Sequence, residues 1–126
     1  MVSLAYVLLG LAAVVHVCIF WLESFAWTAS RTRAAFGTSP EEAEVTRALA
    51  YNQGFYNLFL AVVVAAAIVL RIAGHTQGSV ALAIAGAGSM VAAAVVLATS
   101  DHSKLRAAAI QGAAPALGLI ALAFTG

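Results

Sequence analysis

The sequence predicts an all-α fold, an integral membrane bundle of four transmembrane helices. The 126-residue chain is 63% hydrophobic and only 9% charged, whereas soluble domains carry about 25% charged residues. The charges gather in residues 23–47, at 71 and in 101–106. Between them lie uncharged apolar stretches, each close to the roughly 20 residues that cross a bilayer core. We expect a single domain with spans at about 4–24, 50–71, 79–99 and 106–124.

The first span is expected to be a retained helix. No basic region precedes it and no small-residue cleavage site follows it, as a signal peptide would require. The second helix is expected to begin well before its span. Ser39, Pro40 and Glu42 have the spacing of an N-cap, a proline at the first helical position and the acid of a capping box. Apolar residues then recur at helical spacing.

The third and fourth spans are rich in alanine and glycine. Small residues let helices approach closely in lipid, where packing drives association. They would also suit a homo-oligomer. Pro115 is expected to bend the fourth helix. Cys18 is the only cysteine and lies in an apolar run, so we expect a packing residue without a disulfide.

The positive charges predict the orientation of the chain. Cytoplasmic connections carry an excess of Lys and Arg. Five of the six basic residues flank the first and third connections, and one lies in the second. The five are Arg31, Arg33, Arg47, Lys104 and Arg106, and the sixth is Arg71. Both termini should therefore lie on the extracytoplasmic side, with the second helix extended into the cytoplasm.

Polar residues inside the predicted spans are the candidate binding site, because ionisable groups in lipid are costly. Glu23 should lie at the cytoplasmic boundary, with His16 about 10 Å deeper at 1.5 Å per residue. His16, Phe20, Glu23 and Trp27 share one helical face. Amide side chains enter the second and fourth helices from the same side. The predicted ligand-binding residues are His16, Phe20, Glu23, Trp27, Asn52, Gln53, Tyr56, Asn57 and Gln111.

Each of these residues also has a structural interpretation. Glu23 at a span end would sit among headgroups, paired with Arg31 or Arg33. His16 would be a neutral histidine bonded to a neighbouring helix. Intramembrane amides often only hold helices together, at about 0.6 kcal/mol per bond, and Trp27 and Tyr56 suit an aromatic belt. It is their clustering that favours a functional site.

Other classes of site find no support in the sequence. The net charge of +1 leaves no basic patch for nucleic acid. His75 and His102 lie in short connections, and a histidine beside one acid does not make a metal site. There is no phosphate-binding glycine loop, zinc-protease motif or nucleophile elbow. No cofactor and no metal are predicted.

Several motifs resemble a known family. They are the strings HVCIFWLESFAW at 16–27, FG at 36–37, EEAE at 41–44 and NQGFYN at 52–57, with Gln111-Gly112 and Pro115 in the last helix. Together they resemble the small bacterial integral membrane proteins catalogued as domain of unknown function 1304. The resemblance covers essentially the whole chain. It implies a multi-pass protein of the bacterial cytoplasmic (inner) membrane, and it supplies no catalytic residue.

The leading functional hypothesis is a pocket for a small or lipid-like molecule, entered from the cytoplasm or the inner leaflet. Binding without catalysis is favoured over an enzyme. One alternative is an intramembrane acid–base enzyme such as an isomerase, with Glu23 and His16 as the candidate catalytic residues. Another is a small proton-coupled transporter with Glu23 as the titrating group. A third is a structural or assembly subunit. The expected partners are membrane lipid, this ligand and further copies of the chain.

Overall fold

A computed structural model describes residues 1–125, which are almost entirely helical. The long helices are α1 (Val2–Ser24), α3 (Pro40–Ile72), α4 (Thr76–Ser100) and α5 (Leu105–Ala123). The short elements are α2 (Ser30–Phe36) and a 3-10 helix, η1 (His102–Lys104). Four helical segments, α5 being counted together with η1, are long and apolar enough to cross a membrane. The predicted all-α, four-helix architecture is confirmed. The short helix α2 was not predicted from the sequence.

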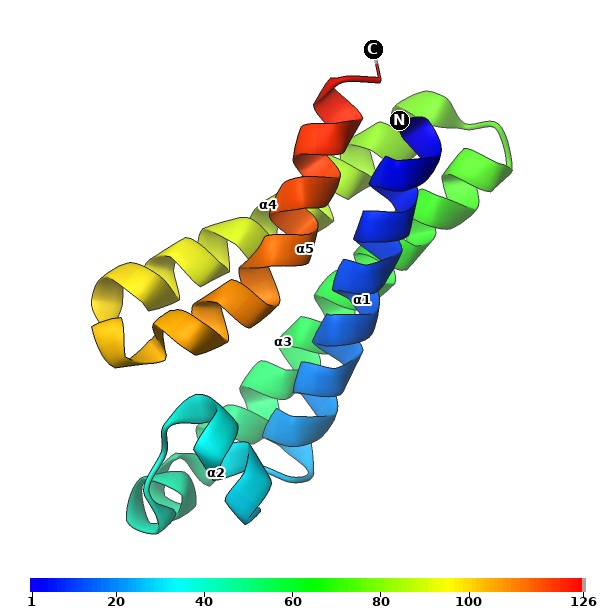
Figure 1. Ribbon diagram of the computed structural model, residues 1–126. Helices are drawn as coiled ribbons and strands as arrows, with labels where there is room; N and C mark the ends of the chain where they lie inside the picture. The colour runs from blue at the N-terminus through cyan, green and yellow to red at the C-terminus, as the bar shows by residue number, and fades with distance from the viewer. Residues whose placement is uncertain (126) are drawn as a thin grey trace.

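The four long helices form a ring in which sequence neighbours are also spatial neighbours. α1 packs against α3 and α5, and α4 packs against the same two helices, so α1 and α4 lie on opposite corners. α1 begins and α5 ends at the same end of the bundle (Figure 1). We call this the terminal end, and we call the opposite end, beside α2, the cavity end.

The start of α3 has the predicted capping box. The Ser39 hydroxyl accepts a hydrogen bond from the Glu42 amide at 3.1 Å, and the Glu42 carboxylate accepts one from the Ser39 amide at 3.4 Å. Pro40 occupies the first helical position. α3 therefore runs unbroken for 33 residues, about 50 Å at 1.5 Å per residue. This exceeds a hydrocarbon core of about 30 Å, so the helix extends beyond its span.

α1 is shorter than the predicted polar face requires. The helix ends at Ser24, and the amide of Phe25 caps it by donating to the Trp21 carbonyl at 2.9 Å. Trp27 therefore lies in the turn after α1, and its predicted place on one helical face with His16 is wrong. Its indole Nε1 instead donates to the Thr46 hydroxyl at 3.1 Å, across to α3. A tertiary contact thus replaces the helical one.

The core is built from small residues packed against a few large ones. Leu9 and Met90 are fully buried among alanines of all four long helices. A Cβ added to Gly118 would lie 3.0 Å from the Leu9 side chain, and one added to Gly86 would lie 2.8 Å from Val64. Glycine at these two positions lets neighbouring helices approach closely, as the sequence predicts.

The outward faces of the helices are apolar. Val7, Val14 and Trp21 follow one another at seven-residue spacing along α1 and are 67%, 60% and 59% exposed. Val62 and Val69 lie seven residues apart on α3 and are 57% and 63% exposed. Contiguous apolar stripes of this kind are rare on soluble monomers. They are typical of helices that face lipid, in agreement with a multi-pass membrane protein.

The α4–α5 hairpin diverges from α1 and α3 toward the cavity end (Figure 1). α5 changes direction near its middle in the same view, and Pro115 lies inside this helix. Proline has no N–H to donate to the carbonyl four residues earlier, here that of Gln111, and its ring crowds that carbonyl. The proline therefore accounts for the change of direction, which moves the tip of the hairpin away from α1.

Candidate functional site: a cavity between the two hairpins

A cavity of about 710 Å³ lies at the cavity end of the bundle. All four long helices contribute to its wall, together with the α1–α3 connection. The apolar residues on its wall are Ile19, Trp27, Phe36, Ala93, Val96 and Leu97. The polar and charged ones are Glu23, Thr38, Glu42, Thr46, Gln53, Asn57, Ser100, Lys104 and Gln111.

The most buried polar groups on the wall are Glu23 and Asn57. They are 8% and 7% exposed, and the Asn57 amide donates to Glu23 Oε1 at 2.5 Å. No residue of 1–125 donates to the second oxygen, Oε2. Every fully shielded side-chain nitrogen or oxygen in this part of the chain has a partner. The unpaired Oε2 is therefore not fully shielded, and Glu23 is one of the residues that line the cavity.

A close approach of α1 and α3 brings these two residues together. Gly54 lies three residues before Asn57 on α3. A Cβ there would collide with the Ser24 hydroxyl and would lie 3.0 Å from the Phe20 carbonyl. That hydroxyl donates to the Tyr51 carbonyl at 2.8 Å, which ties the end of α1 to α3. Only glycine leaves room for this contact, which sets Glu23 beside Asn57.

One face of α3 supplies much of the wall. Glu42, Thr46, Gln53 and Asn57 follow one another at intervals of four, seven and four residues, so they lie on one side of the helix. Sequence reasoning identified Gln53 and Asn57 but not Glu42 and Thr46. The same spacing, extended back through the part of α3 beyond the predicted span, would have found them.

Beside the cavity, the end of α2 contacts the segment between α4 and α5. The Lys104 ammonium donates to the Phe36 carbonyl and, at 3.2 Å, to the Gly37 carbonyl. Gly37 ends α2 in the left-handed conformation, with φ of 64°. A cation at a helix C-terminus satisfies carbonyls that lack intrahelical donors. Lys104 was predicted only as an orientation signal, and no motif reveals this contact.

Five of the nine predicted site residues line this one cavity. Glu23 and Trp27 come from the end of α1 and the turn after it, and Gln53 and Asn57 come from α3. Gln111 comes from α5. Three separate parts of the sequence therefore place polar groups at one level of the bundle.

The other four predicted residues lie elsewhere. His16 is 1% exposed, and its Nδ1 lies 2.9 Å from the Ala12 carbonyl of its own helix. Phe20 packs edge-on against two other phenylalanine rings. Asn52 and Tyr56 are exposed, since they stand one position before Gln53 and Asn57 and so occupy the next face of α3.

The arginines near Glu23 do not pair with it. Arg33 donates to the Thr28 carbonyl at 3.2 Å. The ion pair found within residues 1–125 joins Arg47 to Glu44 at 3.4 Å, and both side chains are exposed. The interpretation of Glu23 as the partner of Arg31 or Arg33 is therefore not supported by the contacts of the described residues.

The fold and the cavity define the class: a small helical protein of the multi-pass membrane type, with a partly polar cavity between two helical hairpins. The chain belongs to the family described as protein of unknown function (DUF1304), whose model matches residues 10–123. This confirms the resemblance carried by the motifs. No curated protein matches the chain, and no solved structure does.

Proposed function

We propose that this protein binds a small or lipid-like molecule in the cavity between the α1–α3 pair and the α4–α5 hairpin. The observation that carries the proposal is the Glu23 carboxylate, 8% exposed, with one unpaired oxygen on the wall of a cavity of about 710 Å³. A buried ionisable group is costly unless a partner satisfies it. Ligand pockets typically measure about 300–1,000 Å³ and combine apolar walls with a few placed polar groups. A ligand would supply the missing partner.

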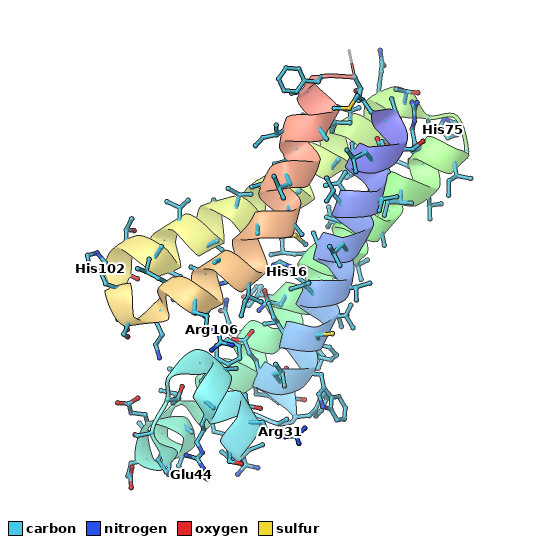
Figure 2. The ribbon with its side chains drawn as sticks, in the orientation of Figure 1. His16, Arg31, Glu44, His75, His102 and Arg106 are labelled. Atoms are coloured by element: carbon cyan, nitrogen blue, oxygen red, sulfur yellow. The ribbon has the colours of Figure 1, made fainter. Side chains whose placement is uncertain are left out.

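The charge distribution supports a cavity end that faces the cytoplasm of a bacterial inner membrane. Arg31 and Arg106 lie toward the cavity end, whereas His75 lies at the terminal end (Figure 2). Of the six basic residues, only Arg71 belongs to the terminal end, since it lies in the last turn of α3. The positive-inside rule then places both termini outside. The ligand would enter from the cytoplasm or the inner leaflet.

Binding without catalysis fits the position of His16. An acid–base enzyme would need a second titrating group within reach of the same substrate atoms as Glu23. His16 is not on the cavity wall, and its ring lies against a carbonyl of its own helix. The isomerase alternative therefore loses His16 as its second group.

Tryptophan fluorescence tests the proposal directly. The chain has two tryptophans, and Trp21→Phe leaves Trp27, on the cavity wall, as the only one. We expect ω-bromododecanol, a neutral lipid-like quencher, to quench Trp27 saturably in detergent micelles. Ala93→Phe should weaken the saturable part because the added ring takes up part of the cavity from α4.

The matched control is Ala92→Phe on the same helix, because Ala92 is exposed and does not line the cavity. This variant should leave the saturable quenching unchanged. Quenching that rises without saturation, or that Ala93→Phe leaves intact, would show only partition of the alcohol into the micelle. Either result contradicts a binding cavity.

A further inference from the structure

The negative and positive charges of the residues on the cavity wall are unequal in number. Glu23, Glu42 and Lys104 are the three charged groups among the lining residues of the described chain. Lys104 directs its ammonium to two backbone carbonyls at the end of α2. Neither carboxylate has a cation within ion-pair distance in residues 1–125. The uncompensated charge that faces the cavity is therefore negative.

Glu23 is the carboxylate that a ligand would meet inside the cavity. Its one hydrogen-bond donor is the neutral amide of Asn57, on Oε1, and Oε2 remains open. A buried carboxylate without a counter-ion is strongly destabilising, and a cation that hydrogen-bonds to it removes most of that cost. The site thus lacks a cationic group that donates to Oε2.

The remainder of the wall suits an apolar body with a cationic end. Trp27 and Phe36 both line the cavity, with ring centroids 5.2 Å apart. Aromatic rings attract cations through the negative charge on their faces. α4 contributes Ala93, Val96 and Leu97, which offer no polar side chain, and Ser100 at its end. A long apolar group would lie along α4 while its charged end lies toward Glu23.

We infer that the cavity binds an amphipathic cation, an alkyl or aryl ammonium whose charged group contacts the Glu23 carboxylate. This inference rests on the proposed binding function and names the class of its ligand. Anionic amphiphiles such as fatty acids should bind more weakly than the cation, because like charges at close range repel. Neutral amphiphiles would bind through the apolar wall alone.

Three quenchers with one chain length test the inference on the full-length Trp21→Phe protein. They are ω-bromododecylammonium, whose N–H groups can donate to the carboxylate, ω-bromododecanol and ω-bromododecanoate, each titrated against Trp27 in neutral detergent. We expect the cation to half-saturate at a concentration at least about tenfold below that of the alcohol, which corresponds to about 1.4 kcal/mol. Glu23→Gln should remove this preference, and Glu23→Asp, which keeps the charge, should retain a preference for the cation.

Glu41→Gln is the matched control, because it removes one exposed carboxylate of α3 that does not line the cavity. It should leave the preference unchanged, which separates Glu23 from the general charge of the surface. Equal saturable binding of cation and alcohol, each weakened by Ala93→Phe, would overturn the cation inference and leave the proposed cavity intact. Absence of saturable quenching by all three would overturn both.

Discussion

At the terminal end of the bundle a buried hydroxyl is fully bonded to neighbouring helices, whereas at the cavity end a buried carboxylate is bonded through only one of its two oxygens. Ser79 is completely buried, and its hydroxyl donates to the Ala67 carbonyl at 2.6 Å and pairs with the Tyr6 hydroxyl at 2.6 Å. The Arg71 guanidinium lies 5.9 Å from the centre of the Tyr6 ring. Glu23, at the other end, keeps one oxygen unpaired on the cavity wall.

The difference lies in how closely the hairpins pack. Leu9 fits against Gly118 at the terminal end, and small residues let all four helices meet there. Toward the cavity end α5 changes direction in a helix that contains Pro115, and the hairpins separate (Figure 1). The hydroxyls of Ser79 and Tyr6 thus hold helices together where all four meet, whereas Glu23 lines the space left where the α4–α5 hairpin separates from α1 and α3.

The largest expected effect is loss of packing at the terminal end. Leu9→Ala should destabilise the protein by about 2–5 kcal/mol, because the fully buried side chain leaves a cavity that its neighbours cannot fill. Reversible unfolding of the detergent-solubilised protein by increasing denaturing detergent would measure it. Leu11→Ala is the control: Leu11 is 51% exposed and should cost far less. Equal losses for the two variants would contradict the assignment of this end as the packed one.

Gly54→Ala tests the contact that sets Glu23 beside Asn57. The added Cβ meets Ser24 and the Phe20 carbonyl, so α1 and α3 must move apart, at about 1–3 kcal/mol. The same variant should weaken binding of any cavity ligand. At Gly88 a Cβ would meet nothing within 4 Å, and Gly88→Ala should be neutral or stabilising, since alanine favours a helix by about 1 kcal/mol. Similar destabilisation by both variants would remove the special role of Gly54.

The helices could be predicted because their signals are local. Long uncharged runs predicted the four spans, and Ser39 with Glu42 predicted the start of α3 to the residue. The polar level at the cavity end was also predicted, since Glu23, Asn57 and Gln111 each follow from depth along a helix. What could not be predicted depends on tertiary contacts. One example is the turn after α1, which brings Trp27 to Thr46 of α3, and another is the contact of Lys104 with the end of α2. No local sequence pattern links the residues of either pair.

The terminal end also holds a polar group that the sequence analysis did not anticipate. Ser79 is fully buried in contact with Tyr6. Serine at the start of an apolar span resembles any helix-end residue, and only the packing of α1 against α3 and α4 shows that it is enclosed.

A smaller effect is expected at the contact between Lys104 and the end of α2. Lys104→Met removes the donor to the carbonyls that end α2, at about 0.5–1.5 kcal/mol for a hydrogen bond of this kind. The clearer result should be a change in reaction rate. In a chain that carries Ala93→Cys and Cys18→Ala, the cysteine should react faster with a water-soluble maleimide when Lys104→Met is added. Arg106→Met, which also removes a basic side chain near the hairpin tip but lines no part of the cavity, should leave the rate unchanged. Identical maleimide reaction rates in the Lys104→Met and Arg106→Met variants would show that Lys104 does not restrict access to the cavity.

The smallest expected effect is a pH dependence of the α4–α5 hairpin tip at the cavity end, where Asp101 lies between α4 and η1. The Ser103 hydroxyl and amide donate to the Asp101 carboxylate at 2.6 and 3.0 Å and lower the pKa of this group below its ordinary value of 3.8. A lowered pKa in the folded state means that the carboxylate stabilises the hairpin tip above the ordinary pKa. This contribution is lost as the pH falls through the lowered value. The difference in unfolding midpoint between the unmodified chain and Asp101→Asn should therefore be constant near neutral pH and shrink in acid. A difference that stays the same in acid would show that the charge at this tip does not contribute.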